Sequence, residues 1–485
     1  MSTTRTSFLF SFAEKYTLLL LSISGGMVIA RLLTPAELGV FSVGAVLVGL
    51  AQVVRDFGVG QYLVQERALD MPKMRAALGT ALLVAVLLAA LVGLGAAPVA
   101  RFYREPRLRE VLHLLSINFL LIPFSALTLP YLRRQMRFSA IYAINATNSA
   151  TNLLVSVSLA LLGFGYLSLA WASVAGTAAA LLVCLLLRPP ELPWLPAWRG
   201  MGAILSFGAF STGGGIIDEA GVAAPDLIIG KVLDVAAVGM FSKALGLLGV
   251  FNQAITSAVS PVVFPLFAAR ARDGGDVRAA YLSTISYVTA LAWPFFAFAG
   301  LMALPLLNLL YGPQWNAAVP LIRIMCFSSA SYSMFSMARY LFVATGHVKA
   351  QAKLDTIAVP VRVGAVLLAA PFGLVWVAWA VFAGALFRCW ITYRYLVRLS
   401  GLELAQMLRA VGKSLLLCGL TAAPAALVLL LWPPQTGRLL WPLALAGAGA
   451  LLCWCAGVVL LKHEIGVEFA LMRRKVRALA AAGQR

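Results

Sequence analysis

A short segment of this chain occurs twice: it reads IARLLTPAELGVFS at residues 29–42 and IGKVLDVAAVGMFS at residues 229–242, which is 229 − 29 = 200 residues later. A second segment is also repeated, as FGYLSLAWASVAG at 164–176 and FGLVWVAWAVFAG at 372–384, with the similar separation 372 − 164 = 208. Two matches at nearly the same separation indicate an internal duplication. The chain is therefore expected to consist of two related halves.

The composition indicates that the two halves form a membrane protein. Of the 485 residues, 61% are hydrophobic and only 12% are charged, and the apolar residues form long runs. A spanning helix needs about 20 mainly apolar residues, because hydrocarbon offers backbone groups no hydrogen-bond partner. This criterion predicts about fourteen transmembrane helices. The expected spans are 9–31, 37–57, 76–100, 109–131, 139–162, 166–187, 203–229, 237–258, 280–306, 317–343, 350–370, 374–396, 407–431 and 440–461.

The repeats fix how these helices are grouped. The first match joins spans one and two to spans seven and eight, and the second joins five and six to eleven and twelve. An even number of spans per half gives both halves the same orientation, so they are parallel repeats related by an axis along the membrane normal. We therefore expect an all-α protein with six-helix lobes at 1–200 and 201–400, a two-helix hairpin at 401–462 and a basic tail at 463–485.

Positive charge predicts the orientation, because Lys and Arg in short loops resist translocation. Expected outer connections at 163–166, 308–316 and 371–373 carry no charge. Both termini should face the cytoplasm, with one exception to the rule in the basic loop that begins at Arg101. The inner connections hold Arg67, Lys73 and Arg75; Arg133, Arg134 and Arg137; Arg188 and Arg199; Arg270, Arg272 and Arg278; Lys349 and Lys353; and Arg394, Arg398 and Arg409.

Several other classes of protein are disfavoured. The net charge of +20 lies mostly in membrane-flanking loops, where anionic headgroups are the nearest partners, so nucleic-acid binding is not expected. The six cysteines fall within expected spans without CxxC spacing, and His113, His347 and His463 are scattered. These patterns predict no disulfide framework, metal site or cofactor.

Two longer segments carry a family resemblance. The first is ARLLTPAELGVFSVGAVLVGLAQVVRDFGVGQYLVQE at 30–66, and the second is its echo PDLIIGKVLDVAAVGMFSKALGL at 225–247. Both resemble the polysaccharide transporter (oligosaccharide flippase) family of the multidrug, oligosaccharidyl-lipid and polysaccharide exporter superfamily, whose members have a twelve-plus-two helix layout. The resemblance covers residues 8–400. Its matched residues serve only as fold markers and include Pro35, Gly39, Pro225 and Gly239.

This resemblance implies a transporter rather than an enzyme. The implied substrate is an oligosaccharide repeat unit on undecaprenyl diphosphate, flipped across the bacterial inner membrane for O-antigen, capsule or exopolysaccharide synthesis by alternating access between the lobes. A polysaccharide polymerase and other assembly proteins are the implied partners. The alternatives are a multidrug or cation antiporter of the same superfamily and a membrane polymerase or ligase, although the latter would be expected to have a large outer loop.

Intramembrane basic residues are the candidates for binding the diphosphate. A charge at the bilayer centre costs about 3 kcal/mol, so it needs water, a partner or a function. Guanidinium groups bind phosphate through two parallel hydrogen bonds. The candidates are Arg323, Arg362, Arg339 and Lys15. In the alternative interpretation Arg339 and Arg388 reach the inner interface, Arg362 pairs with Asp355, and Glu14 neutralises Lys15.

Carboxylates in the second half are the candidates for a coupling proton or sodium ion. Asp218 and Glu219 follow the glycine run 213–215, where a helix can bend and expose carbonyl groups. Asp355 and Thr356 would complete the site, by analogy with related flippases that use carboxylates on these helices. Alternatively, Asp218 and Glu219 are hydrated near the outer interface.

Amide side chains on the fifth span are the candidates for contacting sugar. Asn145, Asn148, Asn152 and Ser156 fall at i, i+3, i+7 and i+11, so they share one helix face. Facing a cavity, they would suit sugar hydroxyls. Facing another helix, they would hold the two helices together.

Overall fold

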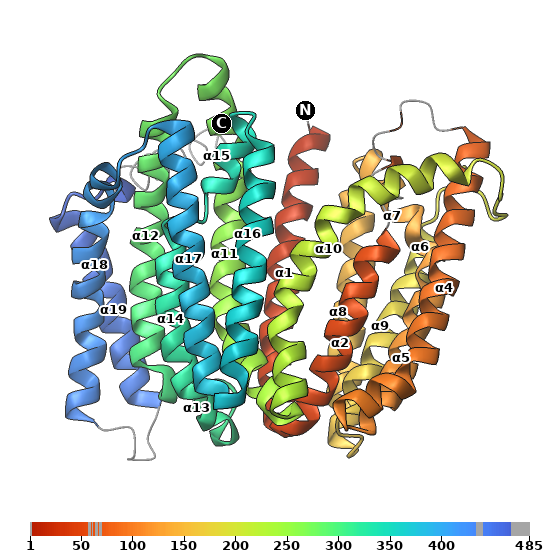
Figure 1. The fold of residues 1–485 in the computed structure, drawn as a ribbon, viewed down its shortest axis with the longest axis horizontal. Coiled ribbons are helices and arrows are strands. Elements are labelled where there is room, and N and C mark those ends of the chain that lie inside the picture. The colour runs from red at the N-terminus through yellow and green to blue at the C-terminus, as the bar shows by residue number, and fades with distance from the viewer. Residues whose placement is uncertain are drawn as a thin grey trace, which may run out of the picture. The chain divides into compact units, whose positions relative to one another are not determined.

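The computed structural model describes residues 2–56, 60, 62–63, 66, 70–432 and 440–466, without the side chains of 2–14, 56, 203, 207, 209–218, 252, 254–258 and 260–261. The described residues are helical and contain no β-strand, which confirms the all-α prediction. The helices gather into two compact units, Met1–Ser242 and Lys243–Arg485. Figure 1 shows their helices, coloured along the chain.

The first unit holds nine helices of the described chain and the start of the next. Its longest members, α4 and α10, both contain a proline. The elements are α1 (Ser2–Leu32), α2 (Pro35–Asp56), α4 (Met71–Tyr103), α5 (Arg107–Leu121), α6 (Pro123–Ala126), α7 (Thr128–Arg134), α8 (Phe138–Leu161), α9 (Leu167–Leu186), α10 (Met201–Val232) and the beginning of α11 (Val235–Arg272).

The second unit contains the rest of α11 and the helices that follow it. Its core surrounds the fully buried Tyr281, Phe267 and Phe342. The elements are α12 (Val277–Leu301), α13 (Ala303–Leu310), η1 (Pro313–Ala318), α14 (Val319–Ser333), α15 (Ala338–Ala344), α16 (Val348–Ala369), η2 (Ala370–Phe372), α17 (Leu374–Ser400), α18 (Leu404–Leu431) and α19 (Leu440–Leu460).

The described helices confirm a multi-pass membrane protein. Ten are long and apolar enough to cross a membrane, and α5 with α6 and α7 makes an eleventh span if this bent pair counts as one. The bend is 41° and lies at Pro123, which cannot donate a backbone hydrogen bond. The remaining expected spans, 139–162, 203–229 and 237–258, are helical as α8, α10 and α11, but their described residues do not meet the same criterion. The total of fourteen stays a prediction.

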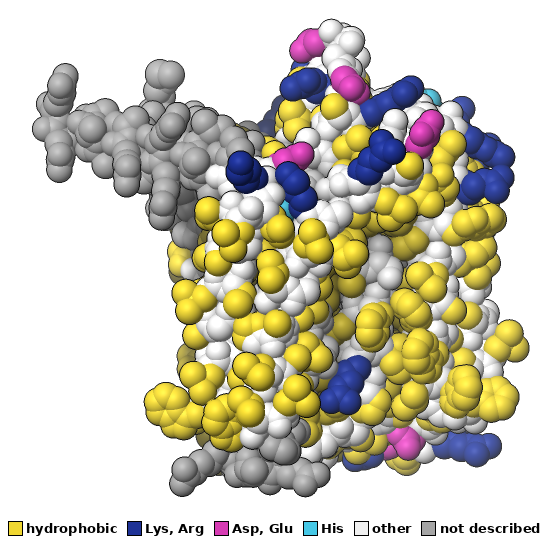
Figure 2. All heavy atoms as spheres, turned by 90° about the vertical axis from the view of Figure 1, so that its left-hand side faces the viewer, with side chains coloured by type: hydrophobic (Ala, Val, Ile, Leu, Met, Phe, Trp, Pro, Cys, Tyr) yellow, Lys and Arg dark blue, Asp and Glu magenta, His cyan; other side chains and the backbone are white. Residues whose placement is uncertain are grey.

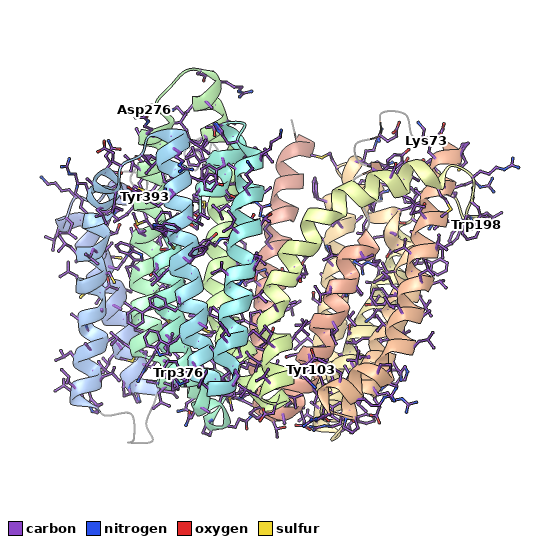
Figure 3. The ribbon with its side chains drawn as sticks, in the orientation of Figure 1. Lys73, Tyr103, Trp198, Asp276, Trp376 and Tyr393 are labelled. Atoms are coloured by element: carbon purple, nitrogen blue, oxygen red, sulfur yellow. The ribbon has the colours of Figure 1, made fainter. Side chains whose placement is uncertain are left out.

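The face of the second unit seen in Figure 2 has the layering of a membrane protein. Hydrophobic side chains form a broad band, and most of the visible Lys and Arg side chains gather at one end, with a few within the band and at the other end. The expected inner loop with Asp276 lies at that end, whereas Trp376, next to the uncharged connection 371–373, lies at the opposite end (Figure 3). This separation is what the distribution of basic residues predicts.

The exceptional basic loop is partly neutralised by its own acidic residues. Arg107 donates two hydrogen bonds of 2.8 Å to the carboxylate of Glu105, and this ion pair lowers the pKa of Glu105. The Tyr166 hydroxyl donates a bond of 2.7 Å to Glu110, and burial raises the pKa of Tyr166 to about 12. The loop thus contains one ion pair, but it stays an exception to the positive-inside rule, which counts Lys and Arg rather than net charge.

The two copies of the repeated segment meet in the first unit. A Cβ on Gly39 would collide with the backbone oxygen of Val235, and a Cβ on Gly239 would collide with the backbone oxygen of Pro35. Since Pro35 and Val235 are equivalent in the repeat, as are the two glycines, the contact is reciprocal, like a contact across a two-fold axis. Only glycine lets the starts of α2 and α11 approach this closely.

The terminal hairpin of α18 and α19 is fixed to α12 by a buried polar network. The ring of His463 is 2% exposed, and its Nδ1 accepts a hydrogen bond from the Ile465 N–H at 3.2 Å. The proton therefore lies on Nε2, which is 3.1 Å from the Ser414 hydroxyl. Ser414 also accepts a bond of 3.0 Å from Thr289 and donates to the Ser286 carbonyl at 3.2 Å. The network requires a neutral His463.

We expect Gly39→Ala to destabilise the protein by about 2–3 kcal/mol or to prevent its accumulation, because the new methyl group meets rigid backbone rather than a movable side chain. The measurement is thermal unfolding of the purified protein in detergent. Gly26→Ala is the control, since nothing lies within 4 Å of a Cβ at that position. Equal unfolding temperatures for the two variants would contradict the close contact.

Acid should loosen the terminal hairpin. Burial lowers the pKa of His463, so the unfolded chain binds a proton more readily than the folded chain. The stabilisation is complete above the unfolded value of about 6.5 and is lost as the pH falls through the lower folded value. The unfolding temperature should fall by about 2 °C more between pH 7.5 and 5 for the natural protein than for His463→Gln. Parallel pH profiles would rule out this role.

Candidate substrate cavity

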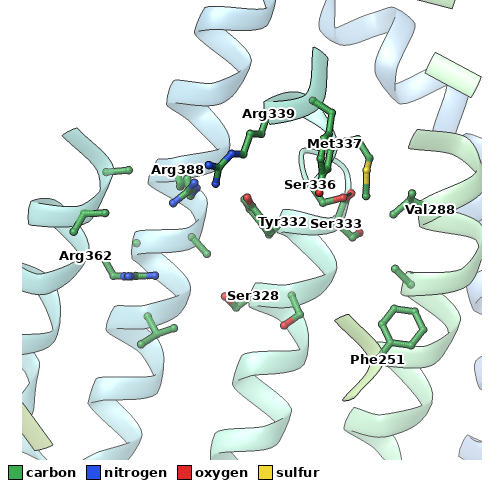
Figure 4. Close-up of a pocket in the computed structure, with 18 residues that line it drawn as sticks. Phe251, Val288, Ser328, Tyr332, Ser333, Ser336, Met337, Arg339, Arg362 and Arg388 are labelled. Carbon is green, nitrogen blue, oxygen red and sulfur yellow. Dashed lines mark hydrogen bonds between the residues drawn. The ribbon is translucent and has the colours of Figure 1, made fainter. Parts of the chain in front are cut away.

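The second unit has an open cavity of about 510 Å³ lined by α11, α12, α14, α15, α16 and α17 and the turn before α15 (Figure 4). Its wall contains three arginines, two tyrosines and four serines, and no Asp or Glu is among the described residues that line it. The lining residues that carry its chemistry are Arg339, Arg362, Arg388, Tyr332, Tyr340, Ser328, Ser329, Ser333 and Ser336. The cavity is therefore basic and rich in hydroxyl groups.

Each arginine comes from a different helix, and two lie deep within their spans. Arg388 is 388 − 374 = 14 residues from the start of α17, which is about 21 Å along a helix. Arg362 is likewise 362 − 348 = 14 residues from the start of α16. In Figure 4 Arg339 and Arg388 point toward one another, with Arg362 further along the cavity. Such a cluster of like charges attracts an anion.

Arg388 is held by an ion pair behind the cavity wall. Its Nη2 lies 2.7 Å from Oδ1 of Asp355, while Oδ2 of Asp355 accepts a 2.7 Å hydrogen bond from Gln351. The guanidinium also lies 5.5 Å from the centre of the Tyr332 ring, within range of a cation–π interaction. Arg388 therefore contacts both a residue of the cavity wall, Tyr332, and a carboxylate that is not among the lining residues.

Gly384 lets α17 approach α16 where Arg362 leaves its helix. A Cβ on Gly384 would lie 3.2–3.4 Å from Cγ, Cβ and Cα of Arg362. In the first unit, a Cβ on the equivalent Gly176 would lie 2.9–3.2 Å from atoms of Asn148 and Asn152 of α8. The second repeated segment therefore ends, in both halves, on the glycine that permits close helix packing.

Two of the four residues predicted to bind the diphosphate line the cavity. They are Arg339 and Arg362. Arg323 and Lys15 do not line it: both side chains are exposed, on α14 and α1. The structure thus brings two of the four predicted residues together and adds Arg388, for which the sequence favoured an interfacial position.

The predicted coupling residues belong to both units, Asp218 and Glu219 to the first and Asp355 and Thr356 to the second. Both carboxylate oxygens of Asp355 accept hydrogen bonds from protein donors, and Thr356 donates to the carbonyl of Ala352 on its own helix. In the first unit, the Glu219 carboxylate lies 3.9 Å from the Cβ position of Gly49 on α2. The side chain of Asp218 lies outside the described residues.

The predicted sugar-contacting asparagines lie beside another helix. Asn148 and Asn152 contact Gly176 of α9, and Ser156 is buried and donates to the carbonyl of Leu153. Asn145 is half-buried on the same helix. For Asn148 and Asn152, these contacts favour the helix-packing interpretation over contact with sugar.

Two charged residues within the expected spans, Lys243 and Asp226, are not among the candidates that the sequence suggests. Lys243 of α11 lies over the rings of Tyr311 and Trp315, with its ammonium 4.9 and 5.7 Å from their centres. Asp226 follows Pro225 on α10, and its Oδ1 atom is buried. A complete inventory of charged residues within the expected spans would have found both.

The fold defines a multi-pass, all-α membrane protein with a basic cavity, and its sequence contains an internal repeat. The sequence profile of the polysaccharide biosynthesis protein family matches residues 28–320, which is more than half of the chain. The chain therefore belongs to the polysaccharide biosynthesis protein family, as the repeated segments suggested.

Curated relatives agree with this assignment. The chain is 26% identical over 312 residues to the succinoglycan biosynthesis transport protein ExoT of Rhizobium meliloti, and 23% identical over 314 residues to the lipopolysaccharide biosynthesis protein WzxC of Escherichia coli. Each match covers 62% of this chain and 61% of the relative, so the matched region spans about three fifths of these relatives.

The fold is similar to that of two solved transporters. One is the lipid II flippase MurJ in an inward closed conformation, with a TM-score of 0.75, 11% identity, and coverage of 95% of this chain and 99% of that one. The other is an inward-facing multidrug resistance MATE family transporter, with a TM-score of 0.67, 14% identity, and coverage of 79% and 95%. At these identities the likeness is one of fold.

Crowding the contact between α16 and α17 should reduce stability. Gly384→Val places its methyl groups against the stem of Arg362, so the unfolding free energy should fall by about 1–3 kcal/mol. Thermal unfolding in detergent measures the change. Gly364→Val on α16 is the matched control, because nothing lies within 4 Å of a Cβ there. A similar loss in both variants would contradict the close contact, because valine has a higher intrinsic helix propensity than glycine.

Proposed function

We propose that this protein moves an oligosaccharide on a lipid diphosphate across the bacterial inner membrane. In this proposal Arg339, Arg362 and Arg388 bind the diphosphate. The observation that carries it is the basic cavity, which has three arginines in its wall and no Asp or Glu among its described lining residues. Asp355 pairs with Arg388 from outside the lining and offsets part of this positive charge. A diphosphate supplies matching negative charge and many acceptor oxygens.

The other groups of the cavity suit the sugar. Ser333 and Ser336 donate their hydroxyl protons to helix carbonyls, so their oxygens remain able to accept hydrogen bonds from sugar hydroxyls. Tyr332 and Tyr340 offer ring faces and hydroxyl groups beside them. The head group would thus pass through the polar cavity while the polyprenyl tail stays in lipid, with both termini in the cytoplasm and the two repeats alternating access.

The comparisons support transport of a polysaccharide precursor. ExoT is named as a biosynthesis transport protein and WzxC as a lipopolysaccharide biosynthesis protein, and the fold is similar to that of a lipid II flippase. The basic cavity disfavours the cationic substrates of a multidrug antiporter, because its charge repels them. A coupling proton or sodium ion would bind Glu219 and Asp218 on α10 rather than Asp355, whose oxygens already accept bonds from Arg388 and Gln351.

Deletion of the gene followed by lipid analysis tests the proposed function. Undecaprenyl diphosphate-linked repeat units should accumulate in the cytoplasmic leaflet and the exported polymer should disappear, because the polymerising step lacks its substrate. Unchanged lipid-linked pools together with increased drug sensitivity would instead indicate an exporter.

Charge removal in the cavity should reduce export. Arg362→Gln and Arg388→Gln should each lower polymer export about tenfold at equal membrane abundance, because each removes a charged donor to phosphate. The measurement is polymer yield in the complemented deletion strain. Arg398→Gln is the matched control, since this exposed arginine lies in the last turn of α17. Normal export in both cavity variants would remove these arginines from the site.

A further inference from the structure

Arg388 can bind either of two anionic groups. On one side it lines the cavity, where the proposed function places the substrate diphosphate. On the other side it forms the 2.7 Å ion pair with Asp355, which does not line the cavity. The side chain of Asp355 is 13% exposed and that of Arg388 is 26% exposed, so the pair is screened only weakly by water. A carboxylate and a phosphate bind guanidinium through the same kind of hydrogen bond.

We propose that Asp355 competes with the substrate diphosphate for Arg388. Asp355 pairs with Arg388 when no substrate is bound, and it pairs with Arg388 again when the substrate leaves. This inference rests on the proposed function and assigns Asp355 a positioning and affinity-setting role. The substrate does not touch Asp355 directly. The substrate binds Arg388 by displacing the carboxylate. Breaking the ion pair therefore offsets part of the free energy of binding between Arg388 and phosphate.

Gln351 allows the carboxylate to stay in place during this exchange. It is 7% exposed, lies one helical turn before Asp355 on α16, and donates a 2.7 Å hydrogen bond to Oδ2. This bond is independent of the bond from Arg388 to Oδ1. When Arg388 turns to the ligand, Asp355 therefore keeps one charge-assisted hydrogen bond and its position. Arg388 has a preformed partner to which it can return.

Such a competitor is useful in a transporter. A cavity of three unopposed arginines would bind diphosphate tightly and release it slowly, whereas transport requires a site that fills on one side and empties on the other. Affinity changes act mostly through the rate of dissociation. A carboxylate that recaptures one of the three arginines shortens the time that the ligand stays bound.

The test is a double-mutant cycle on the full-length protein in lipid nanodiscs. The probe is undecaprenyl diphosphate, and undecaprenol, which lacks phosphate, reports binding of the tail alone. Asp355→Asn should tighten binding of the diphosphate about three- to tenfold, mainly by slowing dissociation, and Arg388→Gln should weaken binding about tenfold. The double variant should bind like Arg388→Gln, since the competitor has no effect without the arginine for which it competes.

Asp273→Asn is the control for loss of one carboxylate, because Asp273 is exposed in the loop after α11. Asp355→Ser gives the same expectation should the Asn variant not fold. Weaker binding in the Asp355 variants would overturn the inference, since it would mean that Asp355 only aims Arg388. An equal effect of Asp355→Asn with and without Arg388 would also overturn it. If the natural protein bound both lipids alike, the proposed diphosphate site itself would fail.

Discussion

The structure depends on the cost of holding guanidinium charges at membrane depth. An arginine near the centre of a span costs about 3 kcal/mol unless water, an anion or a polar wall surrounds it. In the second unit this cost is reduced by a hydroxyl-lined cavity, by the Tyr332 ring beside Arg388 and by the carboxylate of Asp355, which pairs with it. In the proposed function, the positive potential of the three arginines would favour an anionic ligand over a cationic one.

The duplication explains the frame around the cavity but not its chemistry. Gly176 and Gly384 perform the same packing role in the two halves. With the separation of 208 residues in that repeat, Arg362 corresponds to Leu154, since 362 − 208 = 154, and Arg388 corresponds to Ala180, since 388 − 208 = 180. The helices were thus duplicated with their close contact, whereas the arginines belong to the second half alone. The helix packing is thus repeated in both halves, whereas the positive charge of the cavity is not.

The sequence predicted the helices and part of the site, for different reasons. Apolar runs and repeats set the helical architecture, because hydrocarbon leaves the backbone few choices. Arg339 and Arg362 were predicted because charges in spans are expensive, but the same argument also selected Arg323, which is exposed. For Asn148 and Asn152, the helical period defined a shared face without saying what lies opposite. For Arg388, only the direction of its side chain distinguishes a cavity residue from an interfacial one.

Asymmetry of charge suits a ligand that has one charged end. In a lipid-linked oligosaccharide, the diphosphate is the fixed point between a variable sugar and an apolar tail, so a small group of arginines can bind it whatever the sugar is. The sugar would need only adaptable partners, such as the hydroxyl groups of α14 and the rings of Tyr332 and Tyr340. Selectivity for the sugar would then arise from many weak contacts, whereas affinity would depend on few strong ones. A carboxylate that weakens one strong contact adjusts the affinity without changing that selectivity.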